Sequence, residues 1–448
     1  MRNGRLRPRL SPITAGLSSA TIGIGALLAA GALVSACVAA DGSAHRNLVR
    51  QRHGPAARAA LVRAPSGLRA AVRRNLDQTN EYKRWSASAG KCGAQVIPNG
   101  DQKGYSVAIS NKTAVVSVPG MAEDAGTLYI FEQAAKGPAW HLAAKLPDPR
   151  KASKDLYAYS VAISSTSAGT YVAVGGNDYN CKRNFVYIYK GSGKAWHLQQ
   201  TIRDPGSSSL DMFGDAVAMT STMLVIGASC RNKFIGAGYV YLRFSTGWKL
   251  VQTLSDPFQG TGDSFGQALS ITGSTIFVGA NAVAYVYTRG LKPTWKRTAT
   301  LFNPGPKDDA YGDSVTIGGT TAIVGAPNDL SGAGSAYIWR LVGKTWEAKG
   351  MLKTFPGVLG GQFGRSVNLT GNRLIVGMPV FQTCGTAFVF RSSGTKWIRQ
   401  AQIMNPRCAQ AKAGFGFSVS GTSSSMGIFG APDTNNGAGA AYMLPLSK

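Results

Sequence analysis

The chain has 448 residues, of which 56 are glycine and only 15% are charged. A glycine-rich, weakly charged sequence favours many short strands joined by tight turns and argues against a mainly helical protein. The net charge is +27, but the basic residues of the C-terminal body are scattered singly through predicted loops without aromatic residues between them, so no nucleic-acid partner is expected.

Residues 1–40 have the pattern of a signal sequence or membrane anchor. Four arginines lie within the first nine residues, and the stretch from Ile13 to Ala40 is apolar or small and carries no charge. This stretch is longer than the roughly 20 residues that cross a bilayer as a helix. Because basic residues precede it, we expect the body on the far side of the membrane. The sequence therefore predicts a membrane-anchored, extracytoplasmic protein of the cell envelope or cell surface.

Four fates of this segment stay open. Val34–Cys37 (VSAC) resembles a bacterial lipobox, in which Cys37 would be lipidated and become the new N-terminus. The segment could also be retained as an uncleaved anchor helix, or be removed by signal peptidase after Val38–Ala40 (VAA). An organelle transit peptide is the fourth possibility, since residues 1–76 contain a single acidic residue, Asp41.

Residues 41–84 are interpreted as a basic tether. Residues 1–84 contain 14 Lys and Arg against 3 Asp and Glu, which leaves 34 against 18 for residues 85–448. Arginines in the tether alternate with alanine and leucine, so the part around Ala59–Leu76 could lie on anionic lipid as an amphipathic helix, although Pro65–Gly67 interrupts it. The alternative is a solvated, disordered spacer.

A tryptophan-based repeat fills residues 85–448. Seven tryptophans recur about every 50 residues, and each opens a strand-like stretch that usually ends in Asp-Pro or Asn-Pro. They are Trp85, Trp140, Trp196, Trp248, Trp295, Trp346 and Trp397. Because proline fixes φ and an Asx side chain bonds its own backbone, these dipeptides predict tight turns.

Each unit also contains an aromatic–glycine dipeptide at the start of a strand-like stretch. The clear copies are Phe213-Gly214, Phe265-Gly266, Tyr311-Gly312, Phe363-Gly364 and Phe415-Gly416, and two degenerate copies are Lys103-Gly104 and Tyr157-Ala158. An apolar strand ending in a tight turn follows, as in Thr321–Asp329 (TAIVGAPND), and then a strand with alternating aromatic residues. With the tryptophan strand, each unit has four short strands, as in one β-propeller blade.

This order of motifs resembles the FG-GAP repeat family, which includes the blades of integrin α-subunit heads and of many bacterial surface proteins. The resemblance covers residues 85–448 and implies an all-β fold, a seven-bladed propeller with four-stranded blades. WD40 and kelch repeats fit less well, because no Trp-Asp closes a strand and no Gly-Gly recurs at a fixed position. Only six tryptophan strands follow the seven unit starts, so we expect Trp85–Ala89 to supply the outer strand of the last blade and close the ring.

The resemblance implies a non-catalytic function, the presentation of loops for protein or glycan binding and adhesion. No GxSxG, HExxH, P-loop or CxxC motif occurs, so no catalytic or cofactor-binding residue is assigned. Two other functions stay open. One is an extracytoplasmic lyase or hydrolase with its site at the channel mouth, which clustered carboxylates or histidines in the channel would favour. The other is a structural spacer of the envelope.

No metal site is expected, although calcium-binding members of the family carry DxDxDG loops. The nearest match is Asp433–Gly437, which has a single carboxylate, whereas calcium takes six to eight oxygen ligands. His141 and His197 each follow a repeat tryptophan. The variety of residues at this place in the other units predicts a solvent-exposed position on the outermost strand.

Five cysteines lie in the propeller region. Cys181 and Cys230 belong to the same loop of blades 2 and 3, and Cys384 in blade 6 lies near Cys408, which precedes blade 7. The two pairs are therefore disulfide candidates, and Cys92 would remain unpaired or pair where the ring closes. Disulfides fit an exported protein. The alternative is that these are small buried thiols that never meet.

Overall fold

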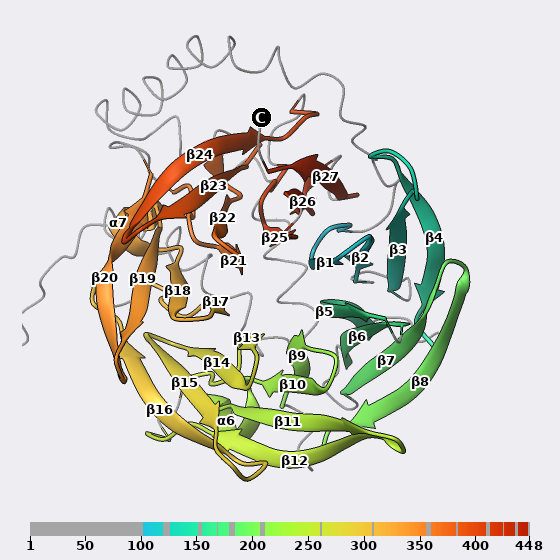
Figure 1. The fold of residues 1–448 in the computed structure, drawn as a ribbon, viewed down its shortest axis with the longest axis horizontal. Coiled ribbons are helices and arrows are strands. Elements are labelled where there is room, and N and C mark those ends of the chain that lie inside the picture. Colours follow the sequence, from blue (N-terminus) through green and yellow to red (C-terminus); the bar gives the residue numbers. More distant parts are fainter. Residues whose placement is uncertain are drawn as a thin grey trace, which may run out of the picture.

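The computed structural model in Figure 1 describes most of the C-terminal body of the chain. The described residues are 102–119, 126–150, 155–167, 169–178, 184–206, 211–259, 262–306, 309–354, 360–381, 384–408, 413–423, 425–434 and 438–446. The N-terminal segment 1–40, the tether 41–84 and Trp85–Ala89 lie outside them. Within these ranges, the helices are too short or too polar to pass through a bilayer.

Seven antiparallel sheets stand around a central axis, one for each repeat unit (Figure 1). Blade 1 contains β1 (Val107–Ser110), β2 (Thr113–Val118), β3 (Thr127–Gln133) and β4 (Trp140–Pro147). Blade 2 contains β5 (Asp155–Thr166), β6 (Gly169–Asp178), β7 (Phe185–Ser192) and β8 (Ala195–Arg203). Blade 3 contains β9 (Phe213–Met219), β10 (Met223–Ala228), β11 (Ala237–Phe244) and β12 (Gly247–Ser255). Blade 4 contains β13 (Ala268–Thr272), β14 (Thr275–Ala280), β15 (Val283–Arg289) and β16 (Trp295–Phe302).

The remaining three sheets complete the circle. Blade 5 contains β17 (Ser314–Gly318), β18 (Thr321–Ala326), β19 (Ser335–Val342) and β20 (Thr345–Lys353). Blade 6 contains β21 (Ser366–Thr370), β22 (Arg373–Met378), β23 (Thr386–Ser393) and β24 (Lys396–Met404). Blade 7 contains β25 (Ser418–Gly421), β26 (Met426–Ala431) and β27 (Ala440–Pro445), three strands in the described part of the chain. The four-residue turns labelled α6 (Arg231–Phe234) and α7 (Asp329–Gly332) in Figure 1 contain residues with positive φ and lie in the loops between the second and third strands of blades 3 and 5.

Burial changes along the radius of each blade. The second strands β10 (MLVIGA) and β18 (TAIVGA) are buried at every residue, because neighbouring blades cover both of their faces. The sequences of such strands are continuous apolar runs, without alternation of apolar and polar residues. The outer strand β8, by contrast, is exposed at most positions but buries Trp196. The repeat tryptophans therefore mark where each outer strand is fixed to the core.

The Asx-Pro turns form as the sequence predicts. In each of five turns, the side-chain oxygen of the Asp or Asn accepts a hydrogen bond from the backbone N–H two residues later, at 2.8–3.0 Å. The acceptors are Asp148, Asp204, Asp256, Asn303 and Asn405. These turns connect the outer strand of one blade with the innermost strand of the next.

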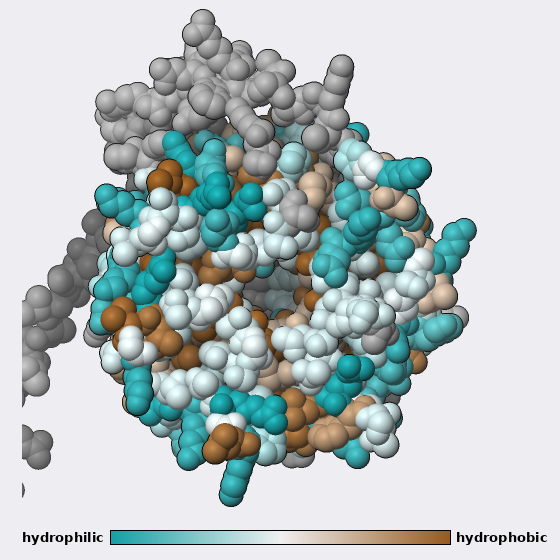
Figure 2. Space-filling view, in the orientation of Figure 1, coloured by the Kyte–Doolittle hydropathy of each residue, from teal (hydrophilic) through white to brown (hydrophobic). Residues whose placement is uncertain are grey.

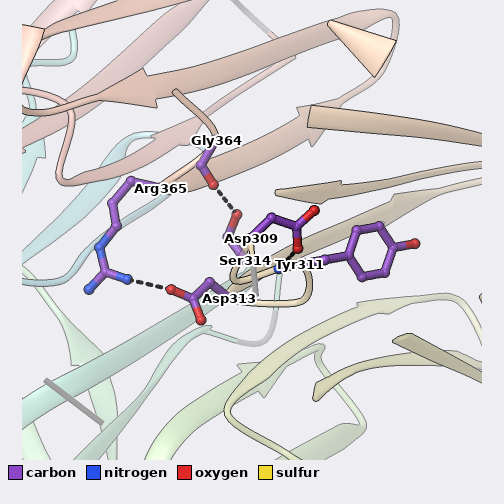
Figure 3. A network of polar contacts seen from close by, with 6 residues as sticks. All are labelled: Asp309, Tyr311, Asp313, Ser314, Gly364 and Arg365. Atoms are coloured by element: carbon purple, nitrogen blue, oxygen red, sulfur yellow. Dashed lines mark hydrogen bonds and ion pairs between the residues drawn. The ribbon is translucent and has the colours of Figure 1, made fainter. Parts of the chain in front are cut away.

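The aromatic–glycine and GAP motifs meet each other between neighbouring blades. At Gly325 of β18, an added Cβ would overlap the carbonyl oxygen of Gly364, the glycine of the next aromatic–glycine dipeptide. The Ser314 hydroxyl donates to that same carbonyl oxygen at 2.8 Å (Figure 3). Gly364 itself has φ +90°, which disfavours any other residue. We call this contact the glycine clamp.

The glycine clamp recurs around the ring. The second-strand glycines that face the next blade in this way are Gly175, Gly227, Gly279, Gly325, Gly377 and Gly430. The serine hydrogen bond to the clamp carbonyl is also made by Ser160, Ser366 and Ser418. The motifs that reveal the repeat in the sequence are therefore the two halves of one contact between blades.

The first and seventh blades meet through the same contact. The Ser418 hydroxyl of blade 7 donates to the Gly104 carbonyl of blade 1 at 2.8 Å. Lys103 pairs with Gly439 in a parallel bridge, as Phe265 pairs with Gly236 elsewhere in the ring. Apolar side chains of both blades share one buried cluster. The inner part of the ring is thus closed without Trp85–Ala89, whose pairing with blade 7 stays a prediction.

Strand direction divides the loops between the two faces of the disc. Because consecutive strands are antiparallel, the loops between second and third strands lie on the same face as those that connect one blade to the next. We call this the loop face. It carries longer segments such as residues 229–236, whereas first and second strands are joined by tight turns on the other face. The aromatic–glycine dipeptides lie at the loop-face end of the innermost strands.

Candidate functional site

The residue after each aromatic–glycine dipeptide occupies the same place in all seven blades. In chain order these residues are Tyr105, Tyr159, Asp215, Gln267, Asp313, Arg365 and Phe417. All seven are partly buried, and we call them the central ring. Figure 2 shows that the molecule is hollowed at its centre, where the innermost strands meet.

A common backbone turn aims these side chains in the same direction. In six blades, the N–H of the central-ring residue donates to the carbonyl three residues earlier, at 3.0–3.2 Å. The first residue of each of these turns has a positive φ, as at Ala310 (+58°), and so does the glycine, as at Gly312 (+100°). Because the turn uses only backbone groups, its geometry does not depend on which side chain it presents.

Direct contacts join five of the seven side chains. The ring centroid of Tyr105 lies 4.8 Å from that of Tyr159 and 5.1 Å from that of Phe417. The Arg365 guanidinium lies 5.0 Å from the centroid of Phe417 and donates to Asp313 at 3.1 Å (Figure 3). A continuous series of contacts therefore runs from blade 2 through blades 1, 7 and 6 to blade 5.

The central ring has an aromatic side and a polar side. Tyr105, Tyr159 and Phe417 are consecutive around the circle, and the other four residues carry carboxylate, amide and guanidinium groups. Burial raises the pKa of both tyrosines, so their hydroxyls stay neutral donors. The arrangement offers flat apolar surfaces opposite directional hydrogen-bonding groups, as is common in small-ligand sites.

The two carboxylates of the central ring have different environments. Burial raises the pKa of Asp215 to about 7, although hydrogen bonds from Ser229 and from backbone N–H groups oppose this shift. Burial also raises the pKa of Asp313, but the neighbouring Arg365 cation opposes that shift. Among the described residues, Asp215 Oδ1 and Gln267 Nε2 of the next blade have no hydrogen-bond partner. Both atoms are buried, so they are not open to solvent in the channel.

The other buried acids of blade 5 serve its loops. Asp309 accepts hydrogen bonds from the Tyr311 N–H at 3.0 Å (Figure 3) and from the Asn303 amide at 2.9 Å. Asp329 accepts from the Tyr337 hydroxyl at 2.7 Å. Across the described ranges, no group of three or more potential metal ligands occurs. These two acids therefore stabilise the loops of blade 5 through their hydrogen bonds.

The cysteines singled out from the sequence have different outcomes. Cys384 and Cys408 form a disulfide with Cα atoms 5.6 Å apart, which links the loop after β22 to the segment before blade 7. Cys230 is buried in the loop after β10. Cys181 and Cys37 lie outside the described residues, so the Cys181–Cys230 pairing and the lipidation of Cys37 stay predictions.

The other candidate residues lie away from the centre. His141 and His197 are exposed on the outer strands β4 and β8, as expected from the varied residues at this position. Asp433 is exposed in the loop after β26, and the end of the Asp433–Gly437 segment lies outside the described residues. Neither histidine belongs to the central ring.

Sequence reasoning from single motifs did not find the central ring. Its members come from seven different repeats, so no local motif contains more than one of them. One signal was present: the position after aromatic–glycine holds aromatic, acidic, amide and guanidinium residues, whereas its neighbours in the repeat hardly vary. Aligning the seven units on this position would have revealed it.

A model of the FG-GAP repeat family matches residues 196–242 and 295–339. Each match begins at a repeat tryptophan and runs through the next blade to its third strand, so it includes one aromatic–glycine dipeptide and one second-strand glycine, which belong to two successive glycine clamps. The chain is an FG-GAP repeat β-propeller.

Other comparisons concern the fold of this FG-GAP propeller. It is similar to a crystal structure of a protein from Lactobacillus plantarum, with 12% sequence identity and a TM-score of 0.50. The match covers 75% of this chain and all of that one. No curated protein matches the FG-GAP propeller in sequence.

Proposed function

We propose that this FG-GAP propeller is a non-catalytic binding protein, anchored by its N-terminal segment and exposed outside the cytoplasm, whose central ring binds a glycan. The observation that carries this proposal is the placement of three aromatic rings opposite carboxylate, amide and guanidinium groups in one channel mouth. Aromatic faces pack on the C–H surfaces of a sugar, and the polar groups bond its hydroxyls. A protein ligand would have to insert a side chain or terminus into the same channel.

Two features support the proposed location. The Arg-rich start followed by the uncharged Ile13–Ala40 stretch fits an exported, membrane-attached chain. The Cys384–Cys408 disulfide fits an oxidising compartment, where such bonds form and persist. Protease added to intact cells should therefore digest the propeller. Full protection in the cytoplasm would contradict the proposed topology.

A glycan array probed with the detergent-solubilised full chain tests the ligand. Tyr105→Ala and Asp313→Ala remove one group from each side of the central ring, and each should weaken glycan binding by at least about tenfold. Phe244→Ala removes an aromatic side chain that is 49% exposed on the outer part of blade 3, and should leave binding unchanged. Equal binding by all variants would contradict the central-ring site, and a chain that binds no glycan would favour a protein ligand or a structural spacer.

A hydrolase or lyase at the channel mouth is the second candidate. It is favoured by the presence of Asp215 and Asp313 in one ring, with the pKa of Asp215 raised to about 7 by burial. A protonated carboxyl near a second carboxylate is the arrangement needed for acid–base cleavage of a glycosidic bond. Product formation from a bound glycan that Asp215→Asn abolishes, with binding retained, would establish this function over simple binding.

A further inference from the structure

A cavity of about 230 Å³ lies between blades 5 and 6, away from the central ring. Its aromatic walls are Phe363, Phe388, Phe390 and Trp397 of blade 6, and Lys353 and Arg399 line it as well. The three phenylalanines are almost fully buried. The ring of Phe363 lies 5.6 Å from that of Phe388 and 6.2 Å from that of Phe390, so the apolar wall is closely packed.

Comparison with the other blades explains why space remains here. The position of Phe388 on the third strand is tyrosine in the other six blades, namely Tyr129, Tyr187, Tyr239, Tyr285, Tyr337 and Tyr442. The outer strand of the preceding blade ends in Asp or Asn at five junctions, but in Thr354 at this one. In blade 4, the Tyr285 hydroxyl donates to Asp256 across the junction at 2.9 Å. Blade 6 lacks both the hydroxyl and the Asx acceptor.

The charges around the cavity indicate the ligand. Lys353 and Arg399 are exposed, and the Arg399 guanidinium lies 5.9 Å from the ring centroid of Phe388. No acidic side chain occurs among the described residues that line the cavity. Two cations beside an apolar pocket favour an anion attached to an apolar group. A dry cavity of about 150 Å³ accommodates benzene, so this one has room for a single aromatic ring with a small anionic substituent.

We propose that the cavity between blades 5 and 6 binds a small aromatic carboxylate. The aromatic ring lies among Phe388, Phe390 and Trp397, and the carboxylate meets Lys353 and Arg399. At this junction Phe388 and Thr354 stand where five other junctions have a tyrosine and an Asx residue. The site is separate from the central ring and does not depend on the function of that ring.

Binding of benzoate to the full chain in detergent, measured by calorimetry with benzyl alcohol as the neutral analogue, tests this proposal. Benzoate should bind at least about tenfold more tightly than benzyl alcohol. Arg399→Gln changes only an exposed side chain and should remove most of that preference. The double variant Thr354→Asp/Phe388→Tyr introduces the pair that Tyr285 and Asp256 form in blade 4, and should abolish binding of both compounds by filling the cavity.

Matched variants separate this site from others. Tyr105→Ala in the central ring should leave benzoate binding unchanged, and thermal unfolding should show that each variant is folded. The proposal is overturned if benzoate does not bind at millimolar concentration, or if benzyl alcohol binds equally well. It is also overturned if Arg399→Gln and the folded double variant both bind benzoate as the unmodified chain does.

Discussion

Replacing Gly325 with alanine should destabilise the propeller through a single contact between blades. A Cβ at this position would overlap both the Gly364 carbonyl oxygen and the Ser314 hydroxyl, and would lie 3.1 Å from the Gly364 carbonyl carbon. The obstacle is backbone of the next blade, which cannot turn away as a flexible side chain would. Gly325 does not adopt a left-handed φ, so the effect comes from steric overlap and not from backbone strain.

The magnitude follows from two costs. Inserting a methyl group into a packed interior costs about 1–3 kcal/mol, and displacing the Ser314–Gly364 hydrogen bond costs about 1 kcal/mol more. The sum is a loss of about 2–4 kcal/mol. At about 2.1 cal/mol/K per residue, a domain of about 350 residues loses about 1.4 °C of Tm per kcal/mol. Gly325→Ala should therefore lower Tm by about 3–5 °C.

Circular dichroism melting of the full chain measures this effect, and Gly290→Ala is the matched control. Gly290 also lacks a left-handed φ, and no neighbouring atom of the described residues lies within 4 Å of a Cβ built there. The control should change stability by less than about 0.5 kcal/mol. If both variants melt at the same temperature, the glycine clamp does not hold the blades as described.

Four further predictions concern pH, the disulfide, the N-terminal strand and calcium. Burial holds the pKa of Asp215 at about 7, above its unfolded value near 3.9, so the carboxyl weakens the fold as pH rises from about 4 to 7. Asp215→Asn should therefore raise Tm at about pH 8 but not at about pH 4, and equal gains at both would contradict the assignment. Cys384→Ser opens a loop closed across a sequence separation of 24 and should cost about 3 kcal/mol in denaturant unfolding, whereas reductant should then have no additional effect at this site. A chain that starts at Glu81 should melt like the full chain, while one that starts at Gly100 should melt lower because it lacks the expected outer strand of blade 7; identical melting would argue against that strand. Millimolar calcium or a chelator should leave Tm unchanged because no turn loop of the repeat holds more than one carboxylate in ligand register, and a shift of several degrees would reveal a calcium site.

The architecture could be predicted from the sequence because the same local interactions recur in it. The Asx-Pro turns, the repeat tryptophans and the aromatic–glycine dipeptides each mark a fixed point of the blade, and the structure places all three as expected. The Cys384–Cys408 disulfide was predictable for a related reason, since the blade count puts both residues at one junction.

The central ring was beyond such local reasoning. The Arg365 cation opposes the rise that burial causes in the pKa of Tyr159, although the two residues belong to blades 6 and 2. Only closure of the ring brings them together. The cavity between blades 5 and 6 was missed for another reason. Phe388 and Thr354 are common residue types, and they stand out only when the repeats are compared, because five other junctions have tyrosine and Asx at these positions.

The backbone turn that presents the central ring has a consequence for how this protein can change over generations. In six of the seven blades the position is held by a backbone hydrogen bond and a glycine conformation that do not involve the presented side chain. A substitution there alters the chemistry of the channel without disturbing the contact between blades. Ligand specificity can therefore change through a substitution in one blade at a time while the backbone of the propeller stays the same. Related chains with this fold are then free to recognise unrelated molecules.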